Sequence, residues 1–410
     1  MLPLLSIKQF FRDMRHQKMR TLMTMFGILW GTVAIILLMG FGTGLHNTQV
    51  KRMKGLGENI AMVWGGITSK TWKGLPRGRR IWFTEDDISR MKATLPGIER
   101  ISPEYVRWRT RFKSKRHNMM ARVAGVWPEF AEMRNLIPLA GGRFINPLDV
   151  IEKRRVIFLG HELSESLFGT RDAVGKTLMV NGIPFTVIGI LKPKEQNSSY
   201  SGRDYRQSWI PASTFKTMWS YRYPEMFIVQ SPTPAAMRAI KKDIYSFMAT
   251  KYNFDPDDSE ALSIWDTTEG LKFIATFFIA FRAFLVGIGC LTLITGGIGV
   301  TNIMNVVLEE RTKEIGIKMA VGAKKGTIMG QFMFETALLT AIGGILGYAL
   351  AMLIIYVFPE SLTEDLGQPT VNTYGVLLAV GFLGLVALIS GYFPARRAAN
   401  LEPVKALKLF

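Results

Sequence analysis

The stretch TLMTMFGILWGTVAIILLMGFGTGL (21–45) contains no charged side chain, and as a helix it is long enough to cross the ~30 Å hydrocarbon core of a bilayer. Three further stretches without charge follow at 283–308, 336–359 and 366–395. Buried helices of soluble proteins are usually shorter and amphipathic, so four such stretches argue against a soluble fold. We therefore predict a bundle of four transmembrane helices, at 21–45, within 273–308, at 328–358 and at 374–395.

The charges that flank these stretches predict their orientation. Lys and Arg cluster before the first span, between the second and third, and after the fourth, whereas the 359–373 connection holds only acidic charges. Short cytosolic loops carry an excess of Lys and Arg. Both termini and the loop at 309–327 are therefore predicted to be cytosolic, with 46–272 outside. A signal peptide is the alternative for the first span, but its apolar core would be shorter, about 7–15 residues.

The excess of basic residues lies mainly outside the membrane in this topology. The chain has 51 Lys and Arg against 32 Asp and Glu, a formal net charge of +19, and most of the surplus falls in 46–272. This position argues against nucleic acid as a partner. The clusters RGRR (77–80) and RWRTRFKSKR (107–116) could bind anionic headgroups, envelope polymers or an acidic protein, or simply form a solvated strand face.

No catalytic, cofactor or metal site is predicted. The single cysteine, Cys290, cannot form an internal disulfide, and the four histidines show no zinc-site spacing. The segment GTRDAVGKT (169–177) resembles a P-loop, but five residues separate Gly169 from Gly175 where a P-loop has four. The chain itself is therefore not expected to hydrolyse ATP.

The outer segment alternates between strand and helix patterns. Thr84, followed by Asp87, predicts a capped helix to about Leu95, and Thr233-Pro234 predicts one to about Lys251. Apolar or alternating runs predict strands at 59–64, 98–112, 118–126, 156–160, 185–191, 227–229 and 261–265. We predict one α+β domain over 46–272, with a subdomain inserted at about 128–222.

Two of the spans are predicted to continue beyond the membrane as stalks. The apolar run from Phe273 to Leu308 is interrupted only by Arg282, and at 1.5 Å per residue a helix of this length spans about 54 Å. The first span likewise continues toward Lys54. Residues 1–20 are predicted to form an amphipathic helix on the cytosolic surface, and 396–410 a cytosolic tail.

Small residues within the spans predict close helix packing. Three glycine pairs are spaced four apart: Gly27 and Gly31, Gly40 and Gly44, and Gly343 and Gly347. Packing within one bundle and dimerisation explain this spacing equally well. Glu335 is the one carboxylate within a span, and it is predicted to contact a backbone or basic group near the inner interface.

The loop LEERTKEIGIKMAVGAKKGTI (308–328) combines dense charge with Ile315, Ile317, Met319 and Val321, and then reaches Gly322. This pattern predicts a short helix that docks a soluble partner. The alternative is an ordinary solvated connection, although such loops rarely expose so many aliphatic side chains.

Within that loop, ERTKEIGIKMAVGAKK (310–325) resembles the loop signature of MacB/FtsX-type ABC transporter permeases. The resemblance extends to KMRTLMTMFGILWGTVAIILLMGFGTG (18–44) as the first span and PARRAANLEPVKAL (394–407) as the tail. GVWPEFAEMRNLIPLAGGRF (125–144), with LFG at 167–169 and GK at 175–176, resembles the periplasmic core domain.

The resemblance implies a dimer of permeases, with a second copy or a paralogue, and two cytosolic ABC ATPases that bind ATP. No ATPase precedes the first span here, so we expect it on a separate chain. In this family the 310–323 loop contacts the ATPase. The residues expected to do so are Glu310, Arg311, Glu314, Ile315, Gly316, Lys318, Met319 and Gly322.

The expected function is mechanotransmission in the bacterial cytoplasmic (inner) membrane. ATP hydrolysis by the partner would move the outer domain for efflux of an amphipathic drug, peptide or other envelope substrate, together with a periplasmic adaptor and an outer-membrane channel where these exist. Lipoprotein release and control of cell-wall hydrolases are alternatives within the family. A membrane-anchored extracytoplasmic enzyme or scaffold is the alternative from another class.

Overall fold

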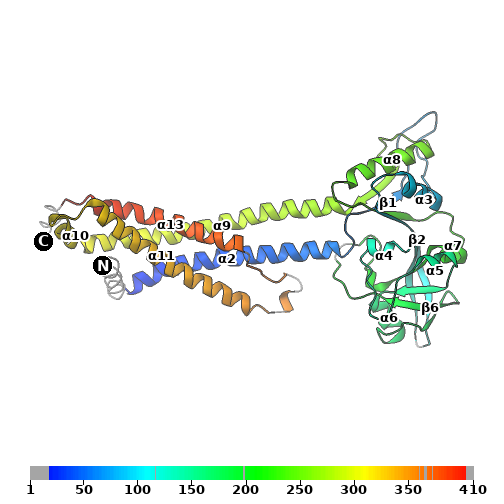
Figure 1. The fold of residues 1–410 in the computed structure, drawn as a ribbon, viewed down its shortest axis with the longest axis horizontal. Helices are drawn as coiled ribbons and strands as arrows, with labels where there is room; N and C mark the ends of the chain where they lie inside the picture. Colours follow the sequence, from blue (N-terminus) through cyan, green and yellow to red (C-terminus); the bar gives the residue numbers. More distant parts are fainter. Residues whose placement is uncertain are drawn as a thin grey trace. The chain divides into compact units, whose positions relative to one another are not determined.

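The computed structural model describes residues 18–115, 117–196, 199–359, 361–363, 367–371 and 373–402. The chain divides into two compact units. Figure 1 shows the chain as a ribbon coloured along the sequence. Unit 1 comprises Met1–Thr48 and Ala275–Phe410, and unit 2 comprises Gln49–Ile274. Most of the predicted surface helix at 1–20, and the end of the tail from 403, lie outside the described residues.

Unit 1 is built from long apolar helices. They are α2 (Lys18–Lys54), α9 (Thr267–Glu310), α11 (Lys325–Tyr356) and α13 (Thr373–Ala399), with the short α10 (Thr312–Ala320) between α9 and α11. All four long helices have the length and composition needed to cross a membrane. Many outward-facing side chains are large and apolar, Leu291, Ile345 and Leu388 among them, as expected of helices in contact with lipid. The predicted fold class, a four-helix membrane bundle with an α+β domain, is confirmed.

Helices α2 and α9 extend beyond the apolar stretches, so that their ends belong to unit 2. The predicted continuation of the first span to Lys54 is present. Helix α9 begins six residues before the predicted start at Phe273, because Asp266 caps it there. The Asp266 carboxylate accepts hydrogen bonds from the backbone amide of Thr268 at 2.9 Å and from its hydroxyl at 2.7 Å.

Unit 2 contains a nine-stranded sheet in the order β3-β7-β4-β6-β5-β2-β8-β1-β9. Each of the predicted strands is present, and the structure has two further short strands that were not predicted, at 177–180 and 207–211. The strands are β1 (Ile60–Gly65), β2 (Arg100–Lys113), β3 (Asn118–Val126), β4 (Val156–Leu159), β5 (Thr177–Val180), β6 (Ile183–Ile190), β7 (Gln207–Pro211), β8 (Met226–Gln230) and β9 (Leu262–Asp266).

One lobe of unit 2 is a split β-α-β arrangement. Strands β9, β1, β8 and the first part of β2 lie side by side and antiparallel, and their core packs against α3 (Glu85–Thr94) and α8 (Met237–Tyr252). The predicted capping box at the start of α3, Thr84 with Asp87, is present. Helix α8 begins at Met237 rather than at Thr233. The carbonyl and hydroxyl oxygens of Thr233 accept a hydrogen bond from the Ala236 amide, which forms a separate turn before the helix.

The other lobe is a six-stranded barrel. The additional pairing of β2 with β3 closes the ring β2-β3-β7-β4-β6-β5, whose interior holds large side chains such as Phe112 and Phe185. Four short helices accompany it: α4 (Phe130–Met133), α5 (Pro147–Ile151), α6 (His161–Phe168) and α7 (Ala212–Trp219). The predicted insertion at 128–222 therefore begins too late, because β3 and the end of β2 belong to this ring. Strand β2 is long enough to pair with β8 at Arg100–Glu104 and with β5 at Phe112–Lys113.

Unit 2 also contains a buried ionic network. Arg134, which is 3% exposed, donates to Asp204 at 2.7 Å, and Lys194 lies 2.7 Å from the other oxygen of the same carboxylate. Burial raises the pKa of Asp204, but the charges of Arg134 and Lys194 more than offset this and hold the pKa below its usual value. Tyr200 connects this group to Glu104, since it accepts from Arg134 and donates to Glu104.

Candidate partner-docking site

Helix α10 is a separate short element with a defined start and end. Arg311 occupies its N-cap position with φ −93° and ψ 3°, which separates α10 from α9. At the other end Gly322 has φ +101°, a conformation that glycine adopts without steric cost. The amide of Ala323 donates to the carbonyl of Lys318 at 3.0 Å, and that of Gly322 to Met319 at 3.1 Å, which is a Schellman motif. The loop therefore presents a helix of fixed length.

The two faces of α10 have different surroundings. Ile315 is 3% exposed and packs in one core cluster with Leu308 of α9 and Phe332 of α11. On the opposite face, Ile317 is 48% exposed and Val321 is 85% exposed. We call this exposed face the α10 stripe, and it consists of Lys313, Ile317, Ala320 and Val321. Their spacing of three and four residues places them on one side of the helix.

An ion pair fixes α10 to its neighbours. Arg311 donates through Nη1 to both carboxylate oxygens of Glu335 in α11, at 3.0 and 3.2 Å. Gln331 donates to the same carboxylate at 3.1 Å. The Arg311 side chain is 10% exposed and that of Glu335 is 4% exposed, so water screens their attraction weakly. The basic partner predicted for Glu335 is thus Arg311, and the pair joins the end of α9 to α11.

A polar groove of about 550 Å³ lies beside the start of α10. One wall comes from the end of α9 and the first residue of α10, and includes Asn305, Glu309 and Thr312. The other wall comes from the end of α13 and includes Arg396 and Arg397. The groove offers a protein partner both signs of charge beside the first residue of α10.

The eight residues predicted to contact the ATPase all lie between the end of α9 and the start of α11, but they differ in exposure. Glu310 and Gly322 are exposed, Met319 is half-buried, and Glu314 forms a partly exposed ion pair with Lys318 at 2.8 Å. Arg311, Ile315 and Gly316 are instead largely buried against other residues of this chain.

Two exposed residues, Ile317 and Val321, were absent from the predicted contact set although the loop's apolar pattern included them. A helical projection of 312–321 separates the two faces and could have found them.

The six predicted packing glycines lie against other segments of unit 1. A Cβ added at Gly27 would lie 3.2 Å from Gly296 in α9, and one at Gly343 would lie 3.0 Å from Ile28 in α2. The neighbours are α9 for Gly27 and Gly31, α2 for Gly343 and Gly347, α11 and the segment 367–371 for Gly40, and the segment 367–371 for Gly44. Contacts within one chain therefore account for this spacing.

Replacing Gly347 by alanine is expected to lower the thermal unfolding midpoint of the full chain in detergent. The added Cβ would lie 2.7 Å from both the Leu29 carbonyl oxygen and the Thr32 Cβ, and overpacking of this kind costs about 1–3 kcal/mol. Gly381→Ala is the matched control, since its added Cβ has no heavy atom of the described residues within 4 Å other than its chain neighbours and the backbone of its own helix. Equal midpoints for the two variants would contradict this packing.

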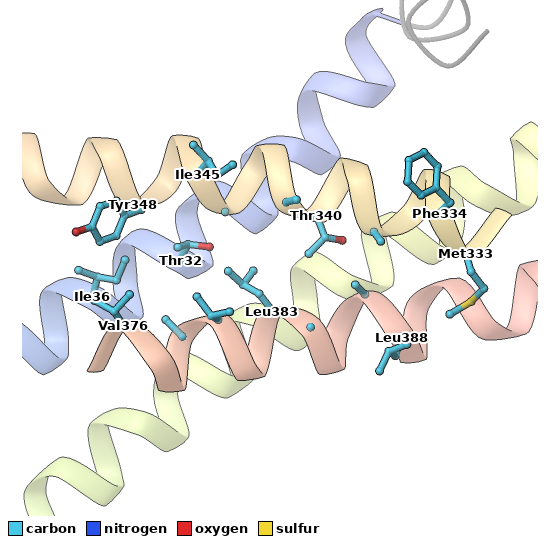
Figure 2. A pocket seen from close by; sticks show the side chains of 17 residues that line it. Thr32, Ile36, Met333, Phe334, Thr340, Ile345, Tyr348, Val376, Leu383 and Leu388 are labelled. Carbon is cyan, nitrogen blue, oxygen red and sulfur yellow. The ribbon is translucent and has the colours of Figure 1, made fainter. Parts of the chain in front are cut away.

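An apolar groove of about 790 Å³ lies between α2, α11 and α13 (Figure 2). Its walls are mainly aliphatic and aromatic side chains, with Ile36, Phe334 and Leu383 among those labelled. The hydroxyls of Thr32 and Thr340 donate to carbonyls of their own helices at 2.8 and 2.9 Å, so the proton of each is already used within its helix. This surface suits acyl chains better than hydrated ions.

Two family models together match most of the chain. The MacB-like periplasmic core domain matches residues 21–246, and the FtsX-like permease C-terminal domain matches residues 273–403. The chain belongs to the MacB/FtsX-type family of ABC transporter permeases. Membership agrees with the resemblance found in the loop, the first span, the tail and the core domain.

Relatives of this permease include macrolide export ATP-binding/permease proteins MacB. The protein from Chlorobaculum tepidum is 31% identical over 98% of this chain and 61% of its own length. The pyoverdine export ATP-binding/permease protein PvdT of Pseudomonas aeruginosa is 28% identical over 98% of this chain and 58% of its own length. The permease thus spans about 60% of the length of these relatives.

Solved structures similar to the permease include the periplasmic region of MacB from Actinobacillus actinomycetemcomitans. It is 16% identical, with a TM-score of 0.43, over 55% of this chain and 97% of that one. The extracellular domain of the transporter YknZ from Gram-positive bacteria is 18% identical, with a TM-score of 0.42, over 50% of this chain and all of that one.

Proposed function

We propose that this permease couples ATP hydrolysis by a cytosolic ABC ATPase, carried on a separate chain, to movement of its extracytoplasmic domain. In this proposal the protein lies in the bacterial inner membrane with both termini in the cytosol. It acts with a second permease copy or a paralogue, has no catalytic site and binds no cofactor of its own.

The α10 stripe is the observation that carries the proposal. Apolar side chains as exposed as Ile317 and Val321 are unfavourable in water and favourable at an interface. Beneath the stripe, Ile315 and the pair of Arg311 with Glu335 tie α10 to α9 and α11. A partner that pushes on α10 therefore acts on α9, which continues as one helix to Thr267 and so contributes to unit 2. A continuous helix transmits displacement along its axis.

The proposed substrate is an amphipathic molecule that the extracytoplasmic domain handles, and the proposed process is efflux or extraction. The apolar groove of Figure 2 belongs to unit 1 and offers little polar surface for a hydrated solute, which supports an amphipathic substrate that is handled outside the bundle. A periplasmic adaptor and an outer-membrane channel are further candidate partners. Lipoprotein release and control of cell-wall hydrolases remain alternatives with the same mechanics.

The double variant Ile317→Asp/Val321→Asp tests the proposed docking. Two carboxylates buried against the partner without compensating charges are expected to reduce co-purification of the ATPase at least tenfold, since a single mismatch of this kind costs about 1–3 kcal/mol. The rate of ATP hydrolysis by the purified ATPase should no longer change when the variant permease in nanodiscs is added.

Ile137→Asp/Ile151→Asp is the matched control, because these side chains of unit 2 are 59% and 72% exposed. This control should retain the ATPase. Normal co-purification with the α10 variant would overturn the proposed interface.

A further inference from the structure

A third groove, of about 550 Å³, lies on the barrel of unit 2, and the proposed coupling does not use it. One wall comes from β2 and β3 and includes Trp108 and Met120. The facing wall comes from the segment that leads into β7 and includes Arg203 and Tyr205. Its volume is that of a pocket for a small molecule rather than of a protein interface.

A β-bulge shapes the first wall. Arg107 pairs with Val123 and Thr110 pairs with Ala121, so two residues of β2, Trp108 and Arg109, lie opposite the single residue Arg122 of β3. Bulges redirect side chains locally and are frequent next to functional sites. Trp108 is thereby left 59% exposed, with the Arg122 guanidinium 5.3 Å from its ring centre.

The bulge also places Arg109 in an unfavourable backbone conformation. Its φ is +55°, a region in which residues other than glycine are strained by about 1–3 kcal/mol. Strain of this kind persists where the surrounding structure requires it and is concentrated at ligand sites. The strand thus maintains Trp108 and Arg109 at the groove at a cost in stability.

The groove carries uncompensated positive charge. Arg122 pairs with Glu104, and Arg206 pairs with Glu162 at 2.7 Å, so these two guanidinium groups are neutralised. Arg109 and Arg203, in contrast, form no ion pair with the described residues, and none of the residues that line the groove is acidic. Arg203 donates to the Tyr205 hydroxyl at 2.6 Å, which holds its guanidinium beside an aromatic face.

Two buried polar atoms in the wall lack hydrogen-bond partners among the described residues. They are Nε of Arg122, a residue that is 5% exposed, and the hydroxyl oxygen of Ser201, which is 6% exposed. Such atoms are rare in folded proteins because each costs the desolvation of a polar group. The wall thus contains polar atoms whose hydrogen bonds the described residues do not supply.

We propose that this groove binds an anionic amphiphile. Arg109 and Arg203 bind its phosphate or carboxylate group, and Trp108, Met120 and Tyr205 contact its apolar portion. Guanidinium groups suit these anions because they donate several hydrogen bonds in a planar array. The inference rests on the proposed function and narrows it, since it names the charge and the binding place of the amphipathic substrate.

Calorimetric titration of the full chain in phosphatidylcholine nanodiscs tests this site. The probe is dihexanoyl phosphatidylglycerol below its micellar concentration, with dihexanoyl phosphatidylcholine and inorganic phosphate as comparison ligands. The anionic lipid is expected to bind, and Arg109→Gln/Arg203→Gln is expected to weaken its binding at least tenfold, as for the loss of charge-assisted hydrogen bonds. Because glutamine keeps a side chain at the strained position, the backbone requirement is unchanged.

Arg238→Gln/Lys242→Gln removes the same charge from exposed positions of α8 and should bind the lipid within twofold of the unaltered protein. The proposal is overturned if both double variants weaken binding equally, or if the zwitterionic lipid binds as tightly as the anionic one. If inorganic phosphate binds as tightly as the lipid, the proposed contacts of Trp108, Met120 and Tyr205 with the apolar portion are wrong. The titration contains no ATPase, so failure of the proposed coupling would leave its result unaffected.

Discussion

Replacing Asp204 by alanine is expected to lower the free energy of unfolding of unit 2 by about 3–5 kcal/mol, because it leaves the charges of Arg134 and Lys194 buried without a counterion. Urea unfolding of the full chain in nanodiscs, followed by tryptophan fluorescence, measures the change. Asp257→Ala is the control, since this carboxylate is exposed, and surface substitutions usually change stability by less than about 0.5 kcal/mol.

The effect of Asp204→Ala should also depend on pH. The folded protein lowers the pKa of Asp204 below the unfolded value of about 3.9, so its contribution is fully present above that value. It is lost as the pH falls through the lower pKa of the folded state. The difference between the unaltered protein and Asp204→Ala should therefore be constant from pH 7 to about 5 and shrink below about 4. A difference that grows in acid would contradict this account.

Replacing Glu335 by alanine is expected to destabilise unit 1 by about 3 kcal/mol, since it removes the carboxylate that Arg311, whose side chain is only 10% exposed, contacts at 3.0 Å. The α10 helix should also become more accessible to protease at the 321–324 turn, because the pair is one of the contacts that hold it. Thermal unfolding and limited proteolysis in nanodiscs measure these changes. Glu309→Ala removes an exposed carboxylate from the end of α9 and is the control.

A second variant separates charge burial from loss of contact. Arg311→Met/Glu335→Leu replaces both partners by apolar side chains of similar size, which is often neutral or stabilising for a buried pair. This double variant should recover most of the stability that Glu335→Ala loses. If the single and double variants are equally unstable, shape rather than charge compensation holds α10 in place.

Local patterns were enough to predict most of the secondary structure. Each span is recognisable because all faces of its helix are apolar, and the start of α3 because Thr84 and Asp87 cap it within one turn. Most of the strands follow from apolar or alternating short runs. These features depend on residues within a few positions of one another, so they are written directly in the sequence.

The candidate docking site was only half predictable. Its location follows from the loop sequence between two spans, but the contact set mixed exposed residues with Ile315 and Arg311, which the tertiary structure buries. The partner of Glu335 lies 24 residues away, beyond any local pattern. Which of several basic groups reaches that carboxylate depends on how α9 and α11 pack.

The sequence by itself determined the four spans, the outer α+β domain and the family, because helical length, apolar composition and short motifs are properties of contiguous residues. Only the tertiary structure decided that β2 takes part in both lobes, that the two faces of α10 differ, and that Trp108 and Arg109 meet Arg203 and Tyr205 across one groove. The physical reason is that strand pairing and side-chain packing bring together residues far apart in the chain, and many pairings satisfy the same local pattern equally well.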